Sequence, residues 1–269
     1  MELDLKYGTG TIKVHIPESA RAQILEPNHL NPVDSVELEL TNALTLLDSA
    51  ESKIRQRLKA ASTVAIAIPD ETRPLPVKEI LPGLLQWLFE SSPELDPSGV
   101  SIIVGGGLHP PLDTETLNRL VPPEIARGCS VAGHDAIQSP MVDYGHTSRG
   151  TPVHINARMA EANFKIVIGQ IDPHQFVGFT GGSKGIIIGC GGSATIEHNH
   201  SLMFHDLAQV GILHGNPVRE DLNEAGEMVG IDLAVNFIMA PTKEVVQVLA
   251  GDPLKMLIKG AATCAALYG

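Results

Sequence analysis

The stretch TVAIAIPD, residues 63–70, decides the fold because it is apolar at almost every position before Asp70. A strand with one solvated face alternates polar and apolar residues. A continuous apolar run is instead typical of a parallel strand that helices cover on both faces. The segment 63–70 therefore predicts a buried strand inside an α/β sheet.

Segments of the same kind recur along the chain and alternate with helical patterns. This alternation predicts an α/β fold with a mostly parallel sheet and helices on both faces, in a single domain that spans residues 1–269. Two short strands around Gly8-Thr9-Gly10 add an N-terminal β-hairpin at 4–16. The other expected strands are 100–107, 164–170, 233–239 and 244–250, and the expected helices are 39–61 (a break at Asp48-Ser49 is left open), 77–90, 113–121 and 252–269.

The composition limits the class of protein and its partners. Of the 269 residues, 43% are hydrophobic, which is enough to bury a core. The formal net charge of −12 disfavours a nucleic-acid partner, because phosphate binding needs clustered cations. The N-terminus lacks a signal-peptide pattern, and no apolar run approaches the roughly 20 residues that cross a membrane. Together with three dispersed cysteines, these features lead us to expect a soluble, cytoplasmic protein without a membrane partner.

Three of the predicted strands end in loops rich in polar residues, glycine and proline. These loops carry Asp70 and Arg73, then His109, then His174. Ligands of open α/β sheets bind outside the carboxyl ends of the strands, so we expect these four side chains to be neighbours in one crevice. Arg73 could clamp a carboxylate there, or it could pair with Asp70 to staple the loop, and the sequence leaves both readings open.

Histidines in such a crevice suggest acid-base chemistry. His109 and His174 could each supply a general base on one face of a substrate. The alternative is a pair of structural histidines with satisfied rings.

The segment IDPHQFVGFTGGSKGIIIGCGG, residues 171–192, is unusually rich in glycine. Such density indicates unusual backbone torsions or a ligand close to the main chain. Lys184, flanked by glycines, could bind phosphate or carry a cofactor covalently, and the alternative is a solvated lysine in a flexible turn. The segment matches a P-loop poorly, because Ser183 and Gly185 stand where that motif has Gly and Ser or Thr.

A second pair of imidazoles lies at His198 and His200. Rings two residues apart share a face on a strand but diverge on a helix, so only one of them would enter a helical site. Nickel, copper and zinc all bind neutral imidazole. The alternative reading is a solvated helix N-terminus after Gly191-Gly192-Ser193.

In these residues the chain resembles the nickel-dependent lactate racemases. The agreement runs in order along most of the chain, which makes it more specific than any single motif. The matching pieces are DETRP at 70–74, GLH at 107–109, HDA at 134–136, GHTSRGTPVHIN at 145–156, IDPHQFVGFTGGSKGIIIG at 171–189, TIEHNH at 195–200, and NPVRED and VNFIM further on.

The resemblance implies a cofactor, the nickel pincer nucleotide, which derives from nicotinic acid mononucleotide and is supplied by cofactor-maturation proteins. It implies that Lys184 joins the cofactor through a thioamide and that His200 completes the nickel coordination. Thr180, Gly181, Gly182 and Ser183 would belong to the turn that wraps the nucleotide phosphate.

The resemblance also implies a reaction, the racemisation or epimerisation of a 2-hydroxy acid such as lactate. His109 and His174 would be the two general bases, while hydride moves reversibly between the substrate carbon and the cofactor through a 2-keto acid. Asp70 would orient a histidine, and Arg73 would hold the substrate oxygens.

Two departures from the family pattern leave alternatives open. Pro110 follows His109 where many members have arginine, and we expect the family's second α/β domain, which closes over the cleft, to be absent from this sequence. The alternative function is therefore a non-catalytic cofactor-binding or nucleotide-binding domain. A metal hydrolase that uses His198 and His200 ranks last, because no carboxylate has zinc-site spacing around them.

Overall fold

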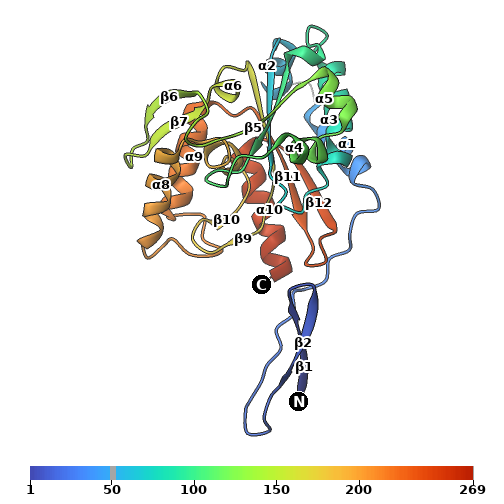
Figure 1. Ribbon diagram of the computed structural model, residues 1–269, viewed down its shortest axis with the longest axis vertical. Coiled ribbons are helices and arrows are strands. Elements are labelled where there is room, and N and C mark those ends of the chain that lie inside the picture. The colour runs from blue at the N-terminus through green and yellow to red at the C-terminus, as the bar shows by residue number, and fades with distance from the viewer. Residues whose placement is uncertain (49–52, 269) are drawn as a thin grey trace.

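A six-stranded sheet forms the centre of the computed structural model, which describes residues 1–48 and 53–268 (Figure 1). The strand order is β12-β11-β8-β3-β4-β5; the first strand is antiparallel to its neighbour, and the other five strands are parallel. The bounds are β3 (Val64–Pro69), β4 (Val100–Gly105), β5 (Ser130–Gly133), β8 (Phe164–Gln170), β11 (Leu233–Met239) and β12 (Val245–Gly251).

Three antiparallel pairs lie outside this sheet. They are β1 (Glu2–Tyr7) with β2 (Gly10–His15), β6 (Met141–His146) with β7 (Pro152–Asn156), and β9 (Pro173–His174) with β10 (Gly178–Phe179). Figure 1 shows the β1–β2 hairpin standing apart from the body of the molecule.

Helices surround the sheet. The α-helices are α1 (Val36–Thr45), α2 (Lys53–Lys59), α3 (Val77–Ser91), α4 (Thr114–Leu120), α5 (Pro123–Gly128), α6 (Ala157–Ala160), α7 (Lys184–Ile187), α8 (Ser193–Ser201), α9 (Pro217–Val229) and α10 (Pro253–Tyr268), and the 3₁₀ turns are η1 (Leu46–Asp48), η2 (Pro97–Gly99) and η3 (Leu202–Phe204). Among the described residues, we find no helix with the length and apolar character that crossing a membrane requires.

The central strand β3 divides the core into two layers. Its larger side chains, among them Ile66, face α1 and α3, whereas Ala65 and Ala67 face α6, α7 and α9. Small side chains on the second face let α7 approach the sheet closely; a Cβ on Gly185 would lie 2.5 Å from a methyl carbon of Val167. A third cluster, around Leu257, packs α10 on the part of the sheet formed by β11 and β12.

The order in which the chain adds strands to the sheet reverses at β3. From β3 the chain goes to β4 on one side, and it later returns to β8 on the other side. Such a switch point leaves a crevice at the carboxyl ends of the strands, because the loops that follow them diverge.

The structure confirms the predicted α/β class, the mostly parallel sheet with helices on both faces, and the N-terminal hairpin. Pro82 lies inside α3, as expected. The strand predicted at 100–107 ends at Gly105. The helical segment that begins with α1 ends at Asp48, and the next helix begins at Lys53; Ser49 of the suggested break lies outside the described residues, as does Gly269 of the last predicted helix.

We expect Ile66→Ala to lower the free energy of unfolding by about 3 kcal/mol, because it removes a fully buried side chain from the central strand. The matched control is Ile258→Ala on the solvent face of α10, where the isoleucine is 56% exposed and the loss should stay below about 0.5 kcal/mol. Urea denaturation measures both. Equal losses in the two variants would contradict the position of β3 in the core.

Candidate functional site

A cavity of about 400 Å³ opens at the carboxyl ends of β3, β4 and β8. Its volume is in the range of small-molecule sites. The predicted convergence of loops is observed, because side chains from four distant segments line this one cavity. The sequence-predicted residues among them are Asp70, Arg73, His109, His174, Thr180, Gly181, Gly182, Lys184 and His200.

The first polar unit of the cavity is the pair of Asp70 and His109. Oδ2 of the buried Asp70 lies 2.6 Å from Nδ1 of His109, and Oδ1 accepts hydrogen bonds from the main-chain N–H and the hydroxyl of Thr72. Burial by itself raises the pKa of Asp70, but the hydrogen bonds from Thr72 and His109 outweigh it and hold the pKa below its usual value. The carboxylate therefore fixes the Nδ1–H tautomer of His109 and leaves Nε2 as a proton acceptor.

Arg73 is not paired with Asp70. Within the described residues, no hydrogen bond or ion pair engages its guanidinium, although it lines the cavity. Of the two readings of the DETRP loop, the internal staple is therefore not found. The guanidinium interacts electrostatically with Asp172, but its N–H donors make no hydrogen bond to the described residues and could bind an anionic group in the cavity.

His174 provides the second imidazole of the cavity. The main-chain N–H of Val177 donates to its Nδ1 at 3.4 Å, which assigns the proton of the neutral ring to Nε2. Burial lowers the pKa of His174 to about 3, with further lowering from Lys184, Arg219 and Arg73. His174 is therefore neutral around pH 7 and presents a donor where His109 presents an acceptor.

Lys184 begins α7 with its side chain on the cavity. Burial lowers its pKa to about 8, and the positive charges of Arg73 and Arg219 add to the effect. No hydrogen bond or ion pair reaches its ammonium group from any residue that the structure describes. An unpaired amine with this pKa is a good nucleophile near neutral pH and is ready to receive an anion or an acyl group.

The turn before Lys184 depends on glycine. Gly181 has φ +85°, and a Cβ there would lie 2.5 Å from the Ile171 side chain. The N–H of Gly182 donates to Oδ1 of Asn236 at 3.2 Å, so this donor already has a partner.

Two other predicted members of the turn also serve the loop itself. The hydroxyl of Thr180 donates to the carbonyl of Gln170 at 2.8 Å, which ties the turn to the end of β8. Ser183 does not line the cavity, because its side chain packs against Gly226 of α9.

The helix α8 separates the two histidines of the HNH sequence. His200 lines the cavity, and its Nδ1 donates to the carbonyl of Ile196 at 2.8 Å, which leaves the lone pair of Nε2 free. Burial lowers the pKa of His200 although this hydrogen bond opposes the shift, so the ring suits metal binding near neutral pH. His198 instead contacts the carbonyl of Arg149 at 3.2 Å.

The divergence of these rings argues against the metal hydrolase. His198 and His200 do not form the pair that such an enzyme would need. Over residues 1–48 and 53–268, no group of three or more His, Cys, Asp or Glu side chains could hold a metal ion.

The prediction from sequence missed three features of the cavity. Gln170 lines the wall with its Oε1 buried and without a hydrogen-bond partner, while its Nε2 donates to Asp172 at 3.3 Å. Phe176 lies between the rings of His174 and His200, at centroid distances of 4.6 and 5.2 Å. Arg219 lies behind the glycine-rich turn, and its signal in the sequence was a lone arginine in NPVRED.

The fold and cavity define an α/β protein with a ligand site at the switch point of a parallel sheet, built around one lysine and three histidines. Comparison with known proteins identifies the family to which this chain belongs. A model of the lactate racemase N-terminal domain matches residues 7–211, and the chain belongs to that family.

Two curated relatives are lactate racemases. The protein from Lactiplantibacillus plantarum is 29% identical over 259 residues, and the protein from Thermoanaerobacterium thermosaccharolyticum is 25% identical over 270 residues. These alignments cover 93% and 96% of this chain but only 59% and 61% of the relatives. The chain thus spans about three fifths of the length of these proteins.

Two solved structures share the fold. The lactate racemase apoprotein from T. thermosaccharolyticum superposes with a TM-score of 0.86 at 23% identity, covering 99% of this chain and 63% of that one. A Thermotoga maritima protein gives a TM-score of 0.69 at 18% identity, covering 88% of this chain and 61% of that one.

The unpaired ammonium of Lys184 should cost stability. We expect Lys184→Met to raise the free energy of unfolding by about 2 kcal/mol at pH 7, because it removes a half-buried, desolvated charge that no hydrogen bond or ion pair stabilises. The folded-state pKa of about 8 lies below the unfolded value of 10.5, so the unfolded chain binds more protons between these values and wild-type stability rises with pH there. The advantage of the variant should therefore shrink between pH 8 and 10.5.

Urea denaturation at pH 7 and pH 9.5 measures this difference. Lys259→Met, at an exposed position of α10, serves as the control and should change stability little at either pH. A destabilised Lys184→Met protein at pH 7 would show that the amine has a partner within the fold.

Proposed function

We propose that this chain binds a nickel pincer nucleotide covalently at Lys184 and acts in the racemisation or epimerisation of a 2-hydroxy acid, lactate or a related acid. One observation carries the proposal: the half-buried amine of Lys184, which has no hydrogen bond or ion pair, shares a cavity with the free Nε2 of His200 and with two further imidazoles. The naming of both curated relatives as lactate racemases supports the reaction class.

The charges of the cavity fit an anionic cofactor and substrate. Arg73 and Lys184 line the cavity without a hydrogen bond or ion pair to any described residue, and the buried Arg219 adds a third positive charge behind the turn. Of the two acidic groups near these cations, Asp70 is engaged by His109, and Asp172 interacts electrostatically with Arg73, although burial raises the pKa of Asp172. A nucleotide phosphate and a substrate carboxylate would compensate this excess.

The donor set also fits the metal part of the cofactor. A neutral imidazole whose Nδ1–H is held by a carbonyl, as in His200, is the usual form of a histidine ligand. Lys184 would hold the nucleotide, and His200 would contribute the protein ligand to nickel. When bound, the pincer nucleotide would supply a site that accepts and returns hydride.

The remaining residues handle protons and position the substrate. His109, oriented by Asp70, would take the hydroxyl proton at Nε2 on one face of the acid. His174 would serve the opposite face, where its Nε2–H would donate a hydrogen bond to the keto oxygen of the planar 2-keto acid while the proton held by His109 returns to that oxygen. Arg73 would hold the carboxylate so that the reacting carbon is positioned between the two imidazoles.

A second candidate function is a non-catalytic cofactor-binding domain. The observation that favours it is the solvent exposure of the site, because the side chain of His109 is 55% exposed. Water in the cavity weakens the electrostatic stabilisation of a transition state. Both candidate functions include binding of the cofactor, and they differ in whether the protein converts a 2-hydroxy acid.

Covalent attachment is tested by intact-mass analysis of the chain produced together with cofactor-maturation proteins. We expect one added cofactor and one nickel per wild-type chain, and neither in Lys184→Ala, because no other amine lies beside His200 in the cavity lining. Lys259→Ala is the control and should load fully. Wild-type protein with unmodified Lys184 and without nickel would rule out the proposal.

Turnover is tested on loaded protein by chiral chromatography of small 2-hydroxy acids. We expect inversion by the wild type and a rate roughly 100-fold lower for Asp70→Asn at equal nickel content, because His109 loses the carboxylate that fixes its tautomer. Asp206→Asn, an exposed position, is the control and should keep the wild-type rate. Full loading without inversion of any acid would instead support the binding domain.

A further inference from the structure

Arg219 is a fully buried cation without a carboxylate partner. Its side chain has 0% exposure, and its guanidinium donates to main-chain carbonyls. Nε reaches Val177 and Nη1 reaches Gly181, each at 3.4 Å, while Nη2 donates to the carbonyl of Phe179. A buried charge without a counter-ion is costly, so a functional reason for it is expected.

The three acceptors are alternate residues of one segment, the stretch that leads from His174 to Lys184. A planar guanidinium with its donors in a fixed fork can hold several carbonyls at set positions. A lysine ammonium is a single point and cannot span the same three acceptors. The contacts of Arg219 therefore fix the course of residues 177–181.

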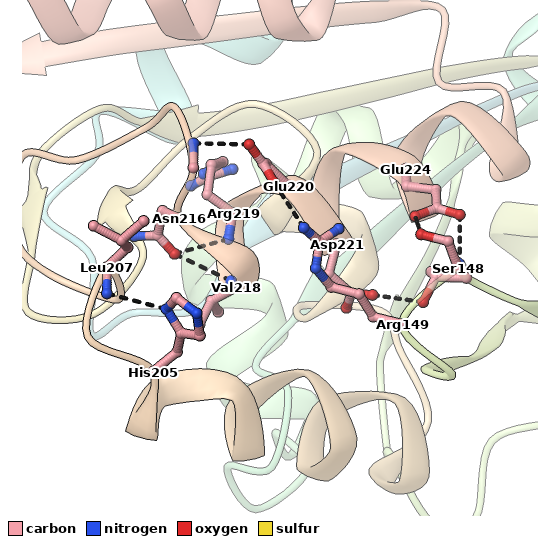
Figure 2. Close-up of polar contacts among 12 residues, drawn as sticks. Ser148, Arg149, His205, Leu207, Asn216, Val218, Arg219, Glu220, Asp221 and Glu224 are labelled. Atoms are coloured by element: carbon pink, nitrogen blue, oxygen red, sulfur yellow. Dashed lines mark hydrogen bonds and ion pairs between the residues drawn. The ribbon is translucent and has the colours of Figure 1, made fainter.

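The rest of α9 supports this arrangement. Oδ1 of Asn216 accepts from the main-chain N–H groups of Val218 and Arg219 and so sets the start of the helix (Figure 2). The same side chain donates through Nδ2 to the carbonyl of Phe176 at 3.0 Å. At the other end, Gly226 lets Ser183 approach so closely that a Cβ would lie 2.2 Å from its Oγ. The helix thus contacts the segment from Phe176 to Ser183 at both ends and in the middle.

We propose that Arg219 is a positioning residue for Lys184: it clamps the carbonyls of residues 177, 179 and 181, and its charge faces the same loop that carries the amine. The clamp keeps the turn in the shape that directs Lys184 into the cavity. This inference deepens the proposed function, in which Lys184 is the cofactor tether, but it concerns the free protein and needs no cofactor for its test.

Arg219 affects Lys184 through its charge as well as through its hydrogen bonds to the turn. After burial and Arg73, Arg219 is the third cause that lowers the pKa of Lys184. Burial also lowers the pKa of Arg219 itself, to about 9, so the guanidinium is still charged at pH 7. A purely structural clamp would leave the titration of Lys184 unchanged, which separates the two roles.

The test uses acetic anhydride as a small acylating probe and follows the Lys184 peptide by mass spectrometry from pH 6.5 to 10. For the wild type we expect the half-maximal rate near pH 8. Arg219→Gln should move this midpoint upward by roughly half a unit to one unit, because a nearby like charge is lost. Arg219→Lys retains the charge and should keep the midpoint, while hydrogen exchange of the amides at 177–182 accelerates about tenfold.

Arg149→Gln is the matched control, because Arg149 contacts the same helix through Glu220 (Figure 2) and should change neither readout. If Arg219→Gln fails to fold, the exchange rates of Arg219→Lys decide the question. Wild-type exchange in Arg219→Lys, or an unmoved midpoint in folded Arg219→Gln, overturns the inference. If the two variants show the expected changes but the wild-type protein never loads the cofactor, this inference stands and the proposed function is wrong.

Discussion

The site depends on one constraint of the sheet, the reversal of strand order at β3. Because β4 and β8 flank β3 on opposite sides, the loops after these three strands diverge and leave a cavity between them. The histidines, the lysine and the arginine that line this cavity come from separate segments between Arg73 and His200. Without the crevice at the switch point they would share no common cavity.

The cavity concentrates positive charge that the fold does not neutralise. Lys184 and Arg73 make no hydrogen bond or ion pair with the described residues through their charged groups, and Arg219 binds carbonyls rather than a carboxylate. Proteins normally avoid unpaired buried cations, because desolvation disfavours the charged form. An anion bound in the cavity would compensate this excess of positive charge.

Much of this architecture could be predicted from local sequence. The apolar run at 63–70 indicated a parallel sheet, and the polar residues that follow the strands indicated the place of the site. Local sequence patterns could not show which side chains pair with one another. Asp70 had two candidates, and the structure pairs it with His109 rather than Arg73. The helical geometry of α8 separates His198 from His200, a distinction that depends on the secondary structure and not on the spacing alone.

The sequence by itself determined the α/β class, the strands of the sheet and the residue types of the site, because hydrophobic periodicity and glycine-rich turns are local properties. Only the tertiary structure decided that α9 lies behind the glycine-rich turn and that Arg219 clamps it. It also decided which imidazole nitrogens stay free and which cations stay unpaired. These features arise from contacts between segments far apart in the chain, and burial sets the pKa values only once the segments have packed together.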